Sequence, residues 1–129
     1  LLMGDFNDYP EDISLTESLL AKGNINELKR GELFNLMYDK AEKHEGSHKY
    51  QKEWGALDQI IVSPNMLNKK NKLRVKNNNA AIYKNAFLLK DDERWMGKKP
   101  SRTYEGFKYS GGFSDHLPVF LDLIYSQEK

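Results

Sequence analysis

Five polar side chains lie at the predicted ends of strands or inside one, and their types together suit one kind of chemistry. They are Asp5, Asn7, Asp58, Asp115 and His116. A carboxylate such as Asp58 could fix the tautomer of the His116 ring and stabilise its cationic form. Asp5 could orient or deprotonate a water, Asn7 could donate to a developing anion, and Asp115 could hold a hard cation. This set suits in-line attack of water on a phosphoester, in which positioning and charge neutralisation supply most of the catalysis.

Three of these residues also have a purely structural explanation. An Asx-turn accounts for Asp5 and Asn7, which flank a single residue after a predicted strand. A lone histidine such as His116 is more often a packed, hydrogen-bonded imidazole than a catalyst. Asp58 is the most informative residue, because an unpartnered carboxylate on an apolar strand face costs on the order of several kcal/mol. We therefore predict that Asp58 lies within hydrogen-bond reach of a His116 ring nitrogen.

Hydrophobic patterning predicts the elements that position these side chains. Residues 54–63 predict the clearest strand, which places Asp58 on an otherwise apolar face. Residues 119–125 predict a final strand, entered from a glycine-rich bend that carries His116. Residues 1–3 predict a strand end before the Asp5 loop. The other predicted elements are a helix from a capping box at Ser14 to Gly23, a helix over 31–44, a solvated basic edge or hairpin over 69–76, a loop tip at 77–79, a strand over 81–89 and a long ordered loop over 95–110.

Length and composition predict one globular domain, over residues 1–129. The chain is 39% hydrophobic and 30% charged, and it contains no apolar run of the roughly 20 residues that span a bilayer. It has no cysteine, which excludes disulfides and thiolate metal sites but leaves the compartment open. The net charge of +1 neither implies nor excludes a nucleic-acid partner. The sequence contains neither a phosphate-binding Gly-x-x-x-x-Gly-Lys run nor a Gly-x-Ser-x-Gly nucleophile elbow.

The ordered motifs carry a resemblance to a known family. Gly4-Asp5-Phe6-Asn7, then Leu57-Asp58, then Gly112-Phe113-Ser114-Asp115-His116-Leu117-Pro118 resemble the last three motifs of the endonuclease/exonuclease/phosphatase family, which has the DNase-I-like fold. Each motif alone is weak, but the ordered set is specific and spans essentially the whole chain. The resemblance implies metal-dependent hydrolysis of phosphoester or phosphodiester bonds, with Mg²⁺ or Mn²⁺ as the cofactor.

The resemblance also implies a role for each matching residue. Asp5 and Asn7 would position the attacking water and contact the phosphate, and Asp58 would support His116, which would contact the scissile phosphate. Asp115 would belong to the metal site. Further candidates for substrate binding lie near these motifs, with packing as the alternative for the tryptophan: Trp54, Arg102 and Tyr104.

One departure from the family pattern concerns its upstream motifs. The family's Asn-containing strand and its principal metal-binding Glu come before the Gly-Asp-x-Asn motif, and here Leu1 stands three residues before Gly4. We therefore expect an α+β fold that is the C-terminal half of a DNase-I-like sandwich, with one mixed sheet, about two helices and an exposed apolar face. An upstream half or a second copy of the chain would cover that face. Activity is expected to require the upstream half, and the alternative is a silent partial domain that only binds or assembles.

The substrate and the compartment stay open at this stage. The family cleaves DNA, RNA, lipid headgroups and other phosphoesters with similar central residues, so nucleic acid is only one candidate partner. No targeting signal is visible, and a soluble protein is expected.

Overall fold

The larger of two main sheets carries Asp5 and Asp58 at one end. The computed structural model describes residues 1–126, so residues 127–129 of the predicted domain lie outside the described part. The sheet has four strands in the order β1 (Leu2–Asp5), β6 (Asp58–Val62), β3 (Leu33–Asn35) and β2 (Ala21–Lys22). Both neighbours of β6 run antiparallel to it, whereas β2 runs parallel to β3. The sheet is therefore mixed, as expected.

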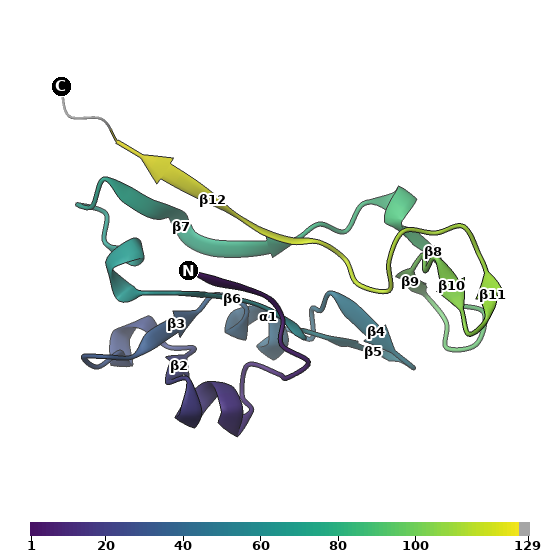
Figure 1. Ribbon diagram of the computed structural model, residues 1–129, viewed down its shortest axis with the longest axis horizontal. Helices are drawn as coiled ribbons and strands as arrows, with labels where there is room; N and C mark the ends of the chain where they lie inside the picture. The colour runs from purple at the N-terminus through teal and green to yellow at the C-terminus, as the bar shows by residue number, and fades with distance from the viewer. Residues whose placement is uncertain (127–129) are drawn as a thin grey trace.

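A second sheet packs across one face of the first. It pairs β7 (Leu73–Ile82) with β12 (Val119–Tyr125) in antiparallel fashion, and Figure 1 shows this ribbon lying over the β6 layer. Ile60 and Val62 of β6 are buried in one cluster with Val75 and Ala80 of β7. Burial of these side chains between the sheets supplies the main hydrophobic core.

The opposite face of β6 is covered by a short helical turn. Ile61, whose side chain alternates with those of Ile60 and Val62, is buried with Leu15 and Ala21. Leu15 belongs to the turn of π-helix at Ser14–Ser18. The two main sheets thus carry a thin outer layer of helical turns, in keeping with an α+β class. The described residues form more than the one sheet expected, and a single short α-helix in place of about two helices, because pairing with β6 draws residues 33–35 into a strand.

Three small hairpins extend from the end of the sheets at which His116 lies. They are formed by β4 (His48–Tyr50) with β5 (Glu53–Gly55), β8 (Leu89–Asp91) with β9 (Lys98–Pro100), and β10 (Tyr104–Glu105) with β11 (Lys108–Tyr109). Figure 1 shows them grouped at one end of the molecule, away from the chain termini. Short 3₁₀ turns complete the described elements, at Ile25–Glu27, Pro64–Leu67 and Ala86–Leu88.

The predicted helix over 31–44 is mostly wrong. Its first part is strand β3, and only α1 (Tyr38–Glu42) is α-helical. The buried amide of Asn35 explains the change, because it donates to Gln59 on β6 at 3.0 Å and accepts from the backbone of Met37 at 3.0 Å. Pairing with β6 therefore overrides the helical spacing of the apolar residues.

The predicted capping box at Ser14 is also wrong. The Ser14 hydroxyl donates to Asp8 at 2.7 Å instead of capping a helix, and the helical turn ends at Ser18. The chain then forms strand β2 where the helix was predicted to continue to Gly23.

Several strand boundaries also differ from the predictions. The strand predicted over 54–63 is divided between β5 and β6, so that Trp54 and Asp58 lie on different elements. Strand β7 runs through the predicted loop tip at 77–79 and ends at Ile82, near the start of the strand predicted over 81–89. Asn77 and Asn78 have positive φ angles, which accommodate the shift in register between β7 and β12. The predicted long loop over 95–110 contains strands β9, β10 and β11.

Strand β12 is confirmed, but its alternation breaks in the middle. The register with β7 shifts between Leu121 and Leu123, so that Leu123 is 47% exposed and Ile124 is half-buried. The described residues include no helix with the length and hydropathy needed to cross a bilayer.

Candidate active site

The predicted contact between Asp58 and His116 is confirmed. The Nδ1 atom of His116 lies 2.7 Å from Oδ2 of Asp58, and the two side chains are 22% and 14% exposed. The hydroxyl of Ser47, which is buried, donates to the same carboxylate oxygen. This arrangement fixes the orientation of the His116 ring and directs its second nitrogen, Nε2, away from Asp58.

Backbone pairing holds the His116 loop against the β4 strand. His116 forms an isolated antiparallel bridge with His48, and the Leu117 amide donates to the Ser47 carbonyl at 2.8 Å. The glycine at 112 allows this loop to pass close to the chain at Ser101, since a Cβ there would lie 2.1 Å from the Ser101 carbonyl oxygen. These backbone contacts fix the conformation of the loop and therefore the position of His116.

Asp5 joins the pair through the pairing of β1 with β6. Its Cα lies opposite that of Asp58 in the ladder, and donor atoms of Asp5, Asp58 and His116 all lie within 4.8 Å of one another. The backbone N–H of Asn7 donates to the Asp5 carboxylate at 2.8 Å, so the Asx-turn that was the structural alternative is also present. Since both side chains are exposed at the same turn, the turn and the proposed site are compatible.

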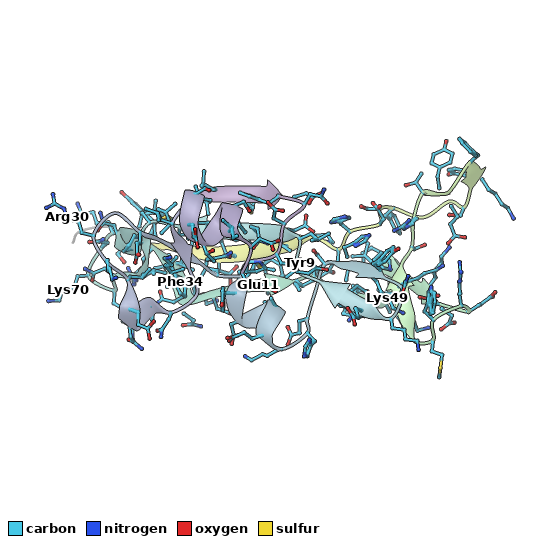
Figure 2. The ribbon with its side chains drawn as sticks, turned by 90° about the horizontal axis from the view of Figure 1, so that it is seen from below. Tyr9, Glu11, Arg30, Phe34, Lys49 and Lys70 are labelled. Atoms are coloured by element: carbon cyan, nitrogen blue, oxygen red, sulfur yellow. The ribbon has the colours of Figure 1, made fainter. Side chains whose placement is uncertain are left out.

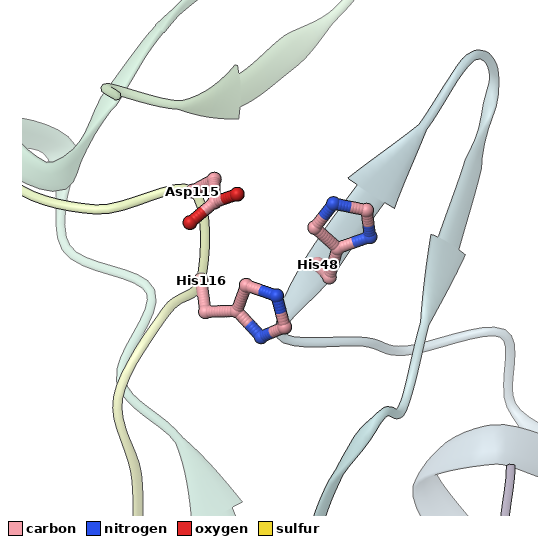
Figure 3. Close-up of side chains that lie close together, drawn as sticks. All are labelled: His48, Asp115 and His116. Atoms are coloured by element: carbon pink, nitrogen blue, oxygen red, sulfur yellow. The ribbon is translucent and has the colours of Figure 1, made fainter. Parts of the chain in front are cut away.

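A second group of possible metal-ligand atoms includes His116 together with His48 and Asp115. Atoms of His48, Asp115 and His116 lie within 4.8 Å of one another, and Figure 3 shows the three side chains facing a common space. The two imidazole rings have centroids 4.7 Å apart and are tilted by 35°. His116 thus belongs to both groups and joins them into one cluster.

Arg102 adds a fixed positive charge beside this cluster. Its Nη2 lies 3.3 Å from Nε2 of His48 and 3.8 Å from the carboxylate of Asp115. A guanidinium is a donor only, so His48 accepts at Nε2 and is the neutral ring in this contact. Burial lowers the pKa of His48, and the neighbouring His116 and Arg102 lower it further against the opposing effect of Asp115 and Asp5.

The carboxylate oxygens of Asp115 and Asp5 are of the ligand type that a hard divalent cation prefers. Asp115 is 52% exposed, which leaves room for a cation that keeps part of its water shell, and oxygen ligands are those that Mg²⁺ prefers. The side of Asp115 that faces Arg102 is less suitable, because the guanidinium already supplies a positive charge there. Asp5 offers a further exposed carboxylate on the other side of His116.

Two other residues predicted to bind substrate make different contacts. Lys84 lies over the Trp54 ring, 3.9 Å from its centroid, and Trp54 lines a separate cavity of about 660 Å³ with Tyr9 and Glu11. Tyr104 packs edge-on against Tyr109 in the β10–β11 hairpin. Their binding roles stay predictions.

Sequence reasoning missed Ser47 and His48. A single Ser-His pair outside a recognisable motif carries no specific signal.

Comparisons with known proteins bear on the identity of the chain. No curated protein and no solved structure gave a significant match. The sequence model of the endonuclease/exonuclease/phosphatase family, however, matches residues 1–125. Because the match covers all the motifs that build the cluster, the chain belongs to the endonuclease/exonuclease/phosphatase family.

Proposed function

We propose that this chain forms one wall of a divalent-metal-dependent phosphoesterase site. Family membership indicates hydrolysis of the nuclease or phosphatase type. The observation that carries the finer proposal is the 2.7 Å contact between Asp58 and His116 beside the carboxylate of Asp5. A half-buried carboxylate, an oriented imidazole and an exposed acid at one strand end suit in-line attack of water.

Each residue has a defined task in this proposal. Asp58 accepts from Nδ1–H of His116 and stabilises the cationic form of the ring, so that Nε2–H faces the scissile phosphate and donates to one of its oxygens. Asp5 accepts a hydrogen bond from the attacking water and takes up its proton, while the side-chain amide of Asn7 contacts the phosphate. Water then adds to phosphorus as the bond to the leaving oxygen breaks, in line with the attack, and the leaving oxygen takes up a proton from solvent.

Asp115 would hold the divalent cation, Mg²⁺ or Mn²⁺, in this proposal. The cation would neutralise charge on the phosphate as it develops. Arg102 supports the same function through its own charge, because a guanidinium pairs with phosphate oxygens through two parallel hydrogen bonds. We expect Arg102 to remain fixed by His48 when a phosphate is bound.

We further propose that the two packed sheets belong to a larger DNase-I-like sandwich and that hydrolysis requires a segment carrying the family's principal metal-binding Glu. Strand β1 is an outer strand of its sheet, and its residues Leu2 and Met3 are 43% and 59% exposed. Such an edge can pair with another strand. The second candidate function follows from the same edge, in which case the chain alone is catalytically silent and only binds or assembles.

Substitution of His116 in the whole protein tests the proposed hydrolysis. His116→Ala should abolish Mg²⁺-dependent release of p-nitrophenol from bis(p-nitrophenyl) phosphate, and EDTA should do the same to the parent protein. His44→Ala is the matched control, because His44 is exposed and lines the separate cavity near Trp54. Equal turnover by the parent and His116→Ala proteins would contradict the proposal.

The silent alternative needs its own measurement. Titration of Mn²⁺ into the 129-residue chain tests whether its metal site is incomplete, since a half site predicts weak binding at Asp115. Tight binding would contradict the need for a further metal ligand.

A further inference from the structure

A cavity of about 430 Å³ opens beside the hydrolytic cluster and has no part in the proposed reaction. Residues of the β4–β5 hairpin, the β8–β9 hairpin and the segment around Arg102 line it. Arg102 thus lines this cavity and also contacts His48 and Asp115. Whatever occupies the cavity therefore lies next to the group that binds at His116.

The inner wall of the cavity is fixed by a buried ion pair. Lys49 Nζ lies 2.9 Å from the carboxylate of Asp92, and each of the two side chains is only 4% exposed. Lys49 also donates to the Met96 carbonyl at 2.7 Å. These contacts join strand β4 to the β8–β9 hairpin, so the cavity is part of the fold and not a gap between independent loops.

The charged groups of the wall favour an anion. Its two carboxylates have lysine partners, since Asp92 pairs with Lys49 and Glu105 lies 3.1 Å from Lys99. The wall then adds the guanidinium groups of Arg94 and Arg102. The cavity therefore presents more positive than negative charge, and guanidinium groups are the preferred side chains for phosphate.

Aromatic side chains stand in the same wall. Tyr50 is 69% exposed at the end of β4, and the guanidinium of Arg94 lies 5.2 Å from the centroid of the Trp95 ring. Aromatic rings interleaved with cationic side chains are typical of surfaces that bind single-stranded nucleic acid, because bases stack on the rings while the cations contact the backbone. A phosphorylated sugar alcohol offers no flat ring for such stacking.

We propose that this cavity binds the nucleotide that neighbours the scissile phosphate, so that the substrate is a nucleic-acid strand. Arg94 contacts the neighbouring phosphate, Arg102 lies between that phosphate and the scissile one, and Tyr50 or Trp95 stacks on the base. This assignment rests on the proposed function for the identity of the scissile position. The presence of the cavity, its charge and its rings does not depend on that function.

Binding of two short probes tests the assignment directly. Thymidylyl-thymidine, TpT, has one internal phosphate, and pTpT adds a terminal phosphate and nothing else. Calorimetry on the full chain with EDTA present prevents turnover and measures binding alone. We expect pTpT to bind about tenfold more tightly than TpT, and Arg94→Gln to remove most of that difference. Tyr50→Ala should weaken both probes while leaving the binding of inorganic pyrophosphate unchanged.

Matched controls separate this subsite from general attraction between charges. Arg30→Gln makes the same change of charge at an exposed position that Figure 2 shows at the opposite end of the molecule. Arg94 is itself exposed, so its substitution is expected to leave the fold intact, which circular dichroism checks. Lys99→Gln provides a second variant in the same wall.

Three results would overturn the nucleotide subsite. They are equal affinity for TpT and pTpT, equal weakening by Arg94→Gln and Arg30→Gln, and an inositol bisphosphate that binds as tightly as pTpT. The last result would indicate a lipid headgroup instead. Because metal is absent from this experiment, binding of pTpT as expected, together with failure of the whole protein to hydrolyse a phosphodiester, overturns only the proposed function.

Discussion

The ring of His116 and the carboxylate of Asp58 meet at 2.7 Å although 58 residues separate them in the chain. The contact joins the loop before β12 to the first residue of β6. Ser47, from the segment that leads into β4, donates to the same carboxylate oxygen. Three distant parts of the sequence therefore converge on one oriented imidazole.

Loss of the Asp58 charge should reduce turnover while the fold is kept. Asp58→Asn preserves the size of the side chain but presents an amide in place of an acceptor-only group, so the His116 ring loses its fixed tautomer. We expect kcat for a phosphodiester to fall by about 10² or more. Asp122→Asn is the control, because Asp122 is an exposed carboxylate that pairs with Lys76. Similar rates for the two variants would remove the orienting role of Asp58.

Arg102 should not be replaceable by lysine. Arg102→Lys keeps the charge but loses the planar fork that reaches both His48 and a phosphate. The expected result is a rise in KM of about tenfold for a phosphodiester, with a smaller change in kcat. Removal of the imidazole in His48→Ala should raise KM in the same direction, since the guanidinium loses its support. An unchanged KM in both variants would show that Arg102 does not meet the substrate.

The metal requirement should move with Asp115. Asp115→Asn removes one anionic ligand, so the concentration of Mg²⁺ that gives half-maximal activity should rise by about tenfold or more. Kinetic titration of the whole protein with Mg²⁺ measures this shift. Glu93→Gln, which changes an exposed acid in the β8–β9 hairpin, serves as the comparison. If the parent and Asp115→Asn proteins reach half-maximal activity at the same Mg²⁺ concentration, the cation binds elsewhere.

The buried pair of Lys49 and Asp92 should make stability depend on pH in acid. The hydrogen bond from Lys49 lowers the pKa of Asp92 below its ordinary value, with further lowering from the Trp95 amide and nearby lysines against the opposing effect of burial. A carboxyl with a lowered pKa in the folded state stabilises the fold above its unfolded-state pKa, and this contribution is lost as the pH falls through the folded value.

Urea unfolding between neutral pH and about pH 3 measures this contribution, since the unfolded carboxyl titrates near 4. The parent chain should lose stability over the acidic part of the range, and Asp92→Asn should be less stable at neutral pH but change less on acidification. Parallel curves for the two proteins would show that Asp92 does not titrate differently in the folded state.

The sequence was most informative where a residue had to have a partner. Asp58 was predicted to meet His116 because a carboxylate in an apolar strand is costly when alone, and that contact is present. The antiparallel ladder then accounts for Asp5, whose Cα lies opposite that of Asp58. Strands β1 and β12 were also predictable, because each contains a short apolar run that is too short for a buried helix and is bounded by a glycine-containing loop.

The sequence was least informative where long-range pairing decides the local structure. Residues 33–35 have helical spacing, but their pairing with β6 and the buried amide of Asn35 select a strand. The role of His48 depends on a backbone bridge to His116 that joins two distant segments. The position of Arg102 depends on the β8–β9 hairpin and the buried Lys49 pair, and no local pattern indicates either contact.

The central claim is that Asp58 acts through His116, and a double-mutant cycle on phosphodiester hydrolysis by the whole protein tests it most directly. The cycle compares Asp58→Asn, His116→Ala and the double variant under saturating Mg²⁺. Residues that act as a unit are strongly non-additive in such cycles. We predict that the double variant is no slower than His116→Ala alone, because Asp58 has no ring left to orient. Losses in rate that multiply in the double variant would contradict the account.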